Sequence, residues 1–295
     1  MELKPWFEAE NYRDLAQYTQ LGEQDQKIVD TYRENGFAVL EQTGIDFSVL
    51  NSAIDSLNGK YTQSATGYSG GGRRQAAWRF SKEVRTIAAS PTILSTLQML
   101  YAREPIPFQT LNFQKPTEQR AHSDTVHFNT LPHGFMCGVW VALEDVDAAN
   151  GPLFYYPGSQ RLPVYHMHDL GLSAGYTSYR HYEDKIESIL KASPYKPSQA
   201  HLKKGQALIW SHNIFHGGST VLDRTRTRLS QVTHFYFPGC IYYTPMLSEP
   251  LQNKWMLRRV RDIRTGKRSP IYEGMNPLFS RASAGLRKLG KFIRR

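Results

Sequence analysis

Two histidines and one aspartate are spaced so that they could hold a single metal ion. His122-Ser123-Asp124 forms a His-x-Asp tripeptide, and His216 follows ninety-odd residues later. Residues i and i+2 of an extended segment project to the same side, so one strand end can present both His122 and Asp124. Two imidazoles and one carboxylate can occupy one face of an iron(II) octahedron and leave the other open for a chelating cosubstrate and dioxygen. The set therefore predicts an iron-dependent oxygenase.

Other histidines compete for these positions. His181-Tyr182-Glu183 and His166-Met167-His168 have the same spacing, but they lie in a Tyr/Ser/Gly-rich stretch without strand periodicity, and we interpret them as solvated loop residues. His212 competes with His216 as the third ligand. We favour His216, because it follows the strand-like run 207–210 and precedes two glycines that would let a ligand approach closely. For His212 a hydrogen-bonded histidine in an aromatic cluster is the simpler interpretation.

A dicarboxylate cosubstrate would need a cation in addition to the metal. One carboxylate can chelate iron, and the other is bound best by the planar guanidinium group of an arginine. Arg226, Arg228 and Ser230 follow His216 and share one parity on an extended strand, so all three can face inward together. A solvated basic hairpin is the alternative for either arginine taken alone. Both arginines are therefore candidates.

The elements that must position these residues change in type along the chain. Apolar residues at helical spacing, with capping and breaking residues, predict helices early in the chain, at Gln24–Asn35, Asp46–Leu57 and Val84–Tyr101, the last interrupted at Pro91. Short runs rich in β-branched and aromatic residues follow. They predict strands at Phe37–Leu40, Phe108–Phe113, Phe135–Glu144, Leu153–Tyr156, Gln206–Trp210 and Arg228–Phe237.

This order predicts a mainly β protein with flanking helices. Crossover helices do not alternate with the strands, which disfavours a parallel sheet and favours a double-sheet jelly roll of the cupin type. We expect one oxygenase domain over residues 1–253, with a helical N-terminal part at 1–105 and the jelly-roll core at about 106–240. Residues 254–295 would form a basic C-terminal extension.

The net charge of +10 belongs to that extension. Residues 254–295 carry 13 Lys and Arg against two acidic residues, which leaves the first 253 residues with a net charge of −1. A nucleic-acid demethylase is disfavoured, because no basic stripe crosses the predicted β domain. Residues 276–295 predict an amphipathic helix, opened by Asn276-Pro277, with a basic face opposite an apolar one. It could contact an anionic membrane surface or a polyanion, or pack on its own domain.

Several features indicate a cytoplasmic protein. No run of eighteen apolar residues exists, and Met1–Arg13 lacks the basic start and apolar stretch of a signal peptide. Cys137 and Cys240 do not suggest a disulfide framework. We expect a cytoplasmic location, with contact to the inner face of a membrane as an option for the C-terminal helix.

An ordered set of motifs resembles the phytanoyl-CoA dioxygenase-like (PhyH) iron(II)/2-oxoglutarate oxygenases. The resemblance covers roughly Gln24 to Phe237 and is more specific than any single motif. The motifs are Glu34–Val39, His122-Ser123-Asp124, Val139–Asp145, Asn150–Leu153 with Tyr156–Ser159, Phe215-His216-Gly217 and Arg228-Leu229-Ser230.

The resemblance implies a double-stranded β-helix core with iron(II) held by His122, Asp124 and His216. It also implies that 2-oxoglutarate is bound by an arginine ten to twelve positions after the last ligand. Arg228 is favoured, since Arg-x-Ser with Ser230 resembles the family pairing, and Arg226 is second. Asn112 and Trp140 match positions that line the cosubstrate pocket in relatives.

The implied reaction uses O2 and 2-oxoglutarate, releases succinate and CO2, and hydroxylates an unactivated C–H bond. Similar halogenases have a small residue where Asp124 stands, so the carboxylate favours hydroxylation. We expect a small or lipid-linked substrate, bound by loops at 67–74, 125–132 and 166–196. The alternative is a non-catalytic cupin-like module that binds a ligand without turning it over.

Overall fold

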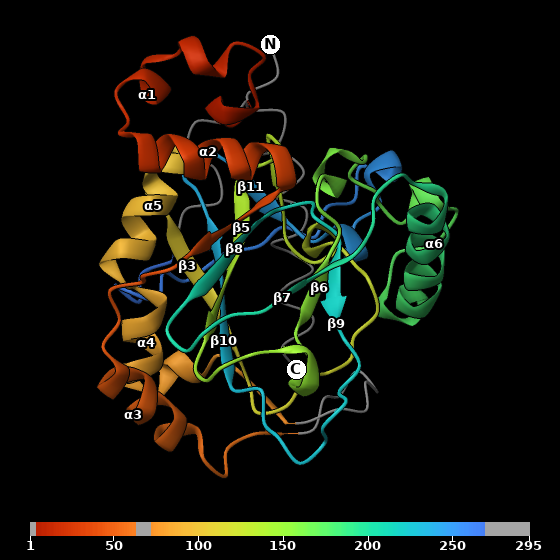
Figure 1. Cartoon of the computed structure of the whole chain (residues 1–295). Helices are drawn as coiled ribbons and strands as arrows, with labels where there is room; N and C mark the ends of the chain where they lie inside the picture. Colours follow the sequence, from red (N-terminus) through yellow and green to blue (C-terminus); the bar gives the residue numbers. More distant parts are fainter. Residues whose placement is uncertain (1–3, 63–71, 269–295) are drawn as a thin grey trace.

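A computed structural model of the chain describes residues 4–62 and 72–268 (Figure 1). Within residues 4–62 and 72–101 the chain forms five α-helices and two short strands. Their caps are local: Gly36, at φ +79°, ends α2, and the Ser90 hydroxyl accepts a hydrogen bond from Ile93 N–H at the start of α5. The helices are α1 (Ala16–Thr19), α2 (Glu23–Asn35), α3 (Phe47–Leu57), α4 (Lys82–Ala88) and α5 (Pro91–Tyr101).

Pro91 separates two helices. The expected helix at 84–101 is therefore two, because Ser90 caps the second one and Pro91 takes its first position, where a missing N–H costs nothing.

The strands of the described residues form three antiparallel sheets. The large sheet has the strand order β1-β8-β5-β10-β3-β2 and contains β1 (Phe37–Leu40), β2 (Arg73–Gln75), β3 (Ile106–Phe113), β5 (Met136–Ala142), β8 (Ala207–Ser211) and β10 (Ser230–Tyr236). A smaller sheet has the order β7-β6-β9 and contains β6 (Leu153–Tyr155), β7 (Ser198–Ala200) and β9 (His216–Gly218). The third pairs β4 (Asn129–Leu131) with β11 (Ile241–Tyr243). The chain is thus a mixed protein of helices and antiparallel sheets.

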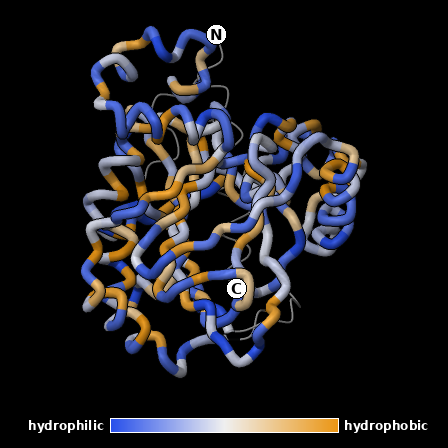
Figure 2. Tube along the Cα trace, viewed as in Figure 1, coloured by the Kyte–Doolittle hydropathy of each residue, from blue (hydrophilic) through white to orange (hydrophobic). Residues whose placement is uncertain are grey.

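The large sheet separates two apolar cores. On one face, alternate residues such as Val141 and Ile209 pack with buried residues of α2, α3 and α5. On the other face, Trp140 and Leu208 share a cluster with Tyr155 of the smaller sheet. Helices α3, α4 and α5 follow one side of the large sheet in Figure 1, and Figure 2 shows the hydrophobic stretches in these helices and in the central strands. The interior between the two sheets is where side chains of distant strands meet.

The stretch around His181 is a helix and not a loop. Helix α6 (Tyr179–Ala192) buries Tyr182, Ile186 and Leu190, which recur every fourth residue and pack beside Phe215. This periodicity is helical, so our interpretation of this stretch as a loop is wrong, and solvent exposure was expected wrongly for Glu183 but correctly for His181. His181 is exposed and Glu183 is buried, because residues two apart on a helix point in different directions.

The described part of the C-terminal extension packs on the rest of the chain. Val260 and Ile263 are buried, and Ile263 N–H donates to the Pro107 carbonyl at the start of β3 at 2.9 Å. The amphipathic helix expected at 276–295 lies outside the described residues. Across 4–62 and 72–268, no helix is both long and apolar enough to cross a membrane.

Candidate metal centre

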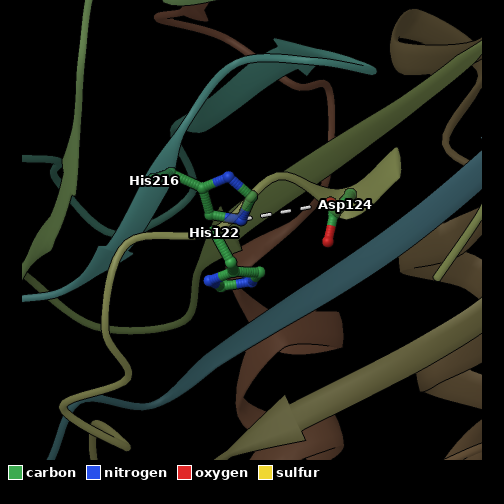
Figure 3. A group of neighbouring side chains, drawn as sticks. All are labelled: His122, Asp124 and His216. Carbon is green, nitrogen blue, oxygen red and sulfur yellow. Dashed lines mark ion pairs between the residues drawn. The ribbon is translucent and has the colours of Figure 1, made fainter. Parts of the chain in front are cut away.

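His122, Asp124 and His216 come together in the interior (Figure 3). His122 precedes Ser123, the N-cap of the short 3-10 helix Asp124–Val126, and His216 begins β9. A β-bridge joins the two histidines: each backbone N–H donates to the carbonyl of the other, at 2.9 and 3.0 Å. One ligand atom from each side chain lies within 4.8 Å of the others, and all three residues are buried. The fold thus brings the side chains of His122 and Asp124 together with that of the distant His216 in one potential metal site.

Backbone carbonyls fix the orientation of both imidazole rings. The Nδ1 atom of His122 lies 3.0 Å from the Arg120 carbonyl, and that of His216 lies 3.2 Å from the Ile214 carbonyl. A carbonyl can only accept, so Nδ1 carries the proton and the lone pair is on Nε2. The His216 Nε2 atom faces Asp124 Oδ2 at 4.0 Å. Such backbone contacts hold a metal-binding tautomer in place.

Two further side chains hold the Asp124 carboxylate. The Trp210 indole N–H donates to Asp124 Oδ2 at 2.9 Å, and His234 Nε2 lies 3.2 Å from the same oxygen. Burial alone would raise the pKa of Asp124, but the nearby histidines His234 and His216 more than offset this and hold that pKa far below its ordinary value. Asp124 is therefore ionised, as a metal ligand must be.

Burial favours the neutral form of three histidines: the ligand candidate His122, and His127 and His212 outside the triad. Burial, reinforced by His216, lowers the pKa of His122 to about 4. Burial likewise lowers the pKa of His127 and of His212 to about 3. At neutral pH these rings carry no proton that a metal would have to displace.

These depressed values predict a pH-dependent stability. An unfolded histidine has a pKa of about 6.5, so between about pH 4 and 6.5 the unfolded chain binds protons that the folded chain does not. The free energy of unfolding must then rise with pH across this window and be lost as the pH falls. His212→Leu should reduce the slope by up to about 1.4 kcal/mol per pH unit. Urea unfolding at several pH values measures it, with the exposed His201→Leu as control. If the unfolding free energy depends on pH equally in both variants, burial of His212 does not lower its pKa as proposed.

The contact from Trp210 predicts a measurable effect on metal binding. In Trp210→Phe an aromatic ring is kept, but Asp124 loses its N–H donor and gains freedom to turn away from the histidines. Metal affinity should fall by about 10- to 100-fold. Titration with Co(II), followed by its visible absorption, checks this, with Trp255→Phe, outside this site, as control. An unchanged affinity would mean that His234 alone orients the carboxylate.

A second polar site lies on the same inner side of the large sheet. Arg228 is buried, and burial lowers the pKa of its guanidinium group to about 10, against an opposing influence of Glu144. Its Nη1 donates to the Ser230 hydroxyl at 3.1 Å. The guanidinium carbon lies 5.3 Å from the centre of the Trp140 ring and 5.5 Å from that of Phe113. No carboxylate within hydrogen-bonding distance among the described residues neutralises this cation.

Two buried donors of this site have no hydrogen-bond partner among the described residues: Arg228 Nε and Trp140 Nε1. Buried donors are almost always satisfied, because an unpaired one costs about 1–3 kcal/mol. A cation and an indole N–H without acceptors are what a bound carboxylate would satisfy. The residues present therefore fit an anionic ligand between Arg228 and Trp140.

The remaining candidates lie elsewhere. Arg226 is on the surface, where Nη1 contacts both Asp147 carboxylate oxygens at 2.9 Å. Asn112 pairs with Gln231, whose amide donates to Val84 of α4, so Asn112 lies on the helix-facing side of the sheet. The structure does not bring Asn112 to the site, since it and Trp140 occupy registers of opposite parity.

The rival histidines are also separate from the triad. His166 and His168 both lie against Asp169, at 3.4 and 3.1 Å, but among residues 4–62 and 72–268 only the triad groups three metal-binding side chains this closely. His212 is buried outside that group.

Sequence reasoning missed Trp210 and His234. The parity of His234 with Arg228 and Ser230 was the available signal, since residues of one parity on a strand share a face.

Comparison with known proteins supports this geometry. Residues 73–226, just over half of the chain, match the family described as Phytanoyl-CoA dioxygenase (PhyH). The chain is similar to Phytanoyl-CoA dioxygenase domain-containing protein 1 of Mus musculus, at 33% identity over 79 residues, and of Danio rerio, at 34%. Each match covers 25% of this chain and 27% of the relative, so it spans about a quarter of the length of these curated relatives.

Solved structures share the fold. The epimerase SnoN from nogalamycin biosynthesis, in complex with Fe3+, alpha ketoglutarate and nogalamycin RO, superposes with a TM-score of 0.59 at 18% identity, covering 74% of this chain and 86% of that one. The carbocyclase SnoK gives 0.61 at 15%, covering 76% and 87%. EctD from S. alaskensis with bound Fe gives 0.58 at 16%, covering 88% of both chains. The family match over residues 73–226, just over half of the chain, shows that this chain belongs to the phytanoyl-CoA dioxygenase (PhyH) family.

Proposed function

We propose that this protein is an iron(II)- and 2-oxoglutarate-dependent dioxygenase that hydroxylates an unactivated C–H bond of a small or lipid-linked molecule. The observation that carries the proposal is the pairing of a buried two-histidine, one-carboxylate group with buried Arg228, which has no carboxylate partner among the described residues. Family membership and the iron and alpha ketoglutarate bound by SnoN support it. Oxygenase activity is the activity that this pairing fits best.

The residues present suit both proposed groups. His122 and His216 would offer Nε2, and Asp124 one carboxylate oxygen, which leaves half of an octahedron for other ligands. Arg228, Ser230 and Trp140 would bind the distal carboxylate of 2-oxoglutarate, and the oxoacid end would point toward the metal. When bound, iron(II) and 2-oxoglutarate supply the oxidising chemistry, in which O2 is consumed, succinate and CO2 are released and one oxygen atom enters the substrate.

The protein's own residues prepare this reaction. Trp210 and His234 keep Asp124 ionised and aimed at the histidines, and the carbonyls of Arg120 and Ile214 keep both rings in one tautomer. Burial excludes water from the site, which strengthens each charge interaction. Positioning in a dry site is thus the contribution of this chain.

Two finer points belong to the same proposal. The larger and smaller sheets share the apolar cluster around Trp140, which supports a double-stranded β-helix with the site between its layers. Asp124 occupies the position that a halogenase would leave free for chloride, which favours hydroxylation. Because SnoN is an epimerase and SnoK a carbocyclase, the product itself has to be identified.

The test measures succinate from purified protein supplied with iron(II), 2-oxoglutarate and pooled metabolites. We expect release that depends on iron and on one pool, and mass spectrometry of that pool should show a product heavier by one oxygen atom. A protein that binds neither iron(II) nor 2-oxoglutarate would instead be a non-catalytic cupin-like module. A product without added oxygen would reject hydroxylation but would still agree with an iron(II)- and 2-oxoglutarate-dependent enzyme.

A further inference from the structure

A short hairpin near the end of the described chain presents arginines on one face. Arg261 pairs with Arg268 in an antiparallel β-bridge, and directly opposed residues project to the same side. The alternate residues Val260 and Asp262 are buried, so Arg259 and Arg261 face the other way. The hairpin therefore has a buried inner face, with Val260 and Asp262, and a cationic outer face.

This cationic face forms one wall of a pocket. The pocket has a volume of about 570 Å³, within the range of small-molecule sites. The opposite wall comes from the segment after β2, including Trp78 and Arg79, and from β3. Among the described residues, five arginines and no acidic residue line it: Arg79, Arg258, Arg259, Arg261 and Arg268.

The arginines of this pocket have no carboxylate partners within the described residues. None of the five forms an ion pair there, whereas Arg264 of the same hairpin pairs with both Asp262 and Glu104, at 2.7 and 2.9 Å. Like charges directly opposite each other, as in Arg261 and Arg268, destabilise a strand pair. On an ordinary solvated surface, repulsion favours arginines that are spread apart, whereas here five of them line one pocket. An anionic ligand would remove the repulsion.

The pocket adjoins the metal centre. Phe108 lines it, and a β-bulge turns Phe108 toward His234, with their rings 6.1 Å apart. Gln109, another lining residue, is the register partner of His234, which contacts Asp124. The Arg258 guanidinium lies 4.7 Å from the Phe128 ring centre, and that ring is 4.9 Å from His234. Two side chains, Phe128 and His234, thus lie between Arg258 and Asp124.

We infer that this pocket binds a phosphate or diphosphate group of the substrate, next to the metal centre that would oxidise the rest of the molecule. Only the statement that the bound molecule is the substrate of the metal centre rests on the proposed oxygenase function. The number of positive charges indicates the chemical class of the ligand. One carboxylate could engage one or two of the five guanidinium groups, whereas a phosphate ester or diphosphate offers several charged oxygens. Arginine binds such groups through paired hydrogen bonds.

Calorimetric titration with inorganic pyrophosphate at constant ionic strength tests the pocket. Wild-type protein should bind it, and Arg259→Gln with Arg261→Gln should weaken binding by about 100-fold, at about tenfold per charged contact. Arg79→Gln, from the opposite wall, should weaken it by about tenfold. Lys267→Gln removes one charge from the same hairpin without lining the pocket, so it should bind as wild type does. Equal affinity in all variants would place anion binding elsewhere and overturn the inference.

A second measurement separates a phosphate of the substrate from a free anion. Succinate release with the active metabolite pool is compared before and after treating the pool with a phosphatase. Loss of release after the treatment supports a phosphorylated substrate, and undiminished release overturns that assignment. Pyrophosphate binding without any 2-oxoglutarate turnover would reject the oxygenase while keeping the anion pocket, so the two failures differ.

Discussion

Asp124→Asn should abolish iron-dependent activity while leaving the protein folded. The amide is as large as the carboxylate and still offers an oxygen to the Trp210 N–H, but it lacks the charge that binds the metal. We expect Fe(II) affinity to fall by more than about 100-fold. Loss of a metal ligand should weaken binding more than loss of a residue that only hydrogen-bonds to that ligand, such as Trp210. Metal content after dialysis against Fe(II), and succinate release, measure both effects.

Asp124→Ala adds a stability effect to the loss of metal. The Trp210 N–H and His234 then have no acceptor in the interior, which should cost about 1–3 kcal/mol of unfolding free energy. Asp147→Ala removes an exposed carboxylate and should change neither metal binding nor succinate release. Full activity in Asp124→Asn would reject the metal assignment, whatever its stability.

Arg228→Met should raise the KM for 2-oxoglutarate by about 100-fold or more, because a charge-assisted contact in a buried site is worth up to about 3 kcal/mol. The same variant should not be less stable without 2-oxoglutarate. The wild-type cation is buried with Ser230 as its hydrogen-bonded side chain and an unpaired Nε, so an apolar replacement removes a desolvation cost. Loss of binding together with unchanged or higher stability would be the signature of a ligand-binding charge.

The matched control is Arg226→Met. Arg226 also follows His216, but its exposed pair with Asp147 should contribute no more than about 1 kcal/mol. KM for 2-oxoglutarate should remain as in wild type. Steady-state kinetics and urea unfolding of both variants measure these effects. A large KM change in Arg226→Met with none in Arg228→Met would reverse the assignment of the two arginines.

Local features of the sequence were sufficient for part of this picture. His122 and Asp124 lie two residues apart, and Arg228 and Ser230 share a parity, so each pair's common side follows from backbone geometry alone. Helix α2 and strand β1 lie within one residue of their expected positions, because Gly36 at positive φ ends one and starts the other. Short-range rules of this kind depend only on neighbours in the chain.

Helix α6 shows where the sequence was misjudged. Its composition suggested a loop, whereas the spacing of Tyr182, Ile186 and Leu190 is helical and their burial against Phe215 stabilises the helix. Tertiary packing can override propensity.

The contacts across the site were decided by tertiary structure. The choice of His216 over His212, the separation of Arg226 from the interior and the location of Asn112 on the far face depend on which strands pair and in which register. The same register brings His234 to Asp124, and a single bulge leaves the Phe108 ring 6.1 Å from that of His234. The sequence by itself determined the ligand types and their local spacing. Only the pairing of distant strands could decide which of them meet, because register is set by the packing of whole faces.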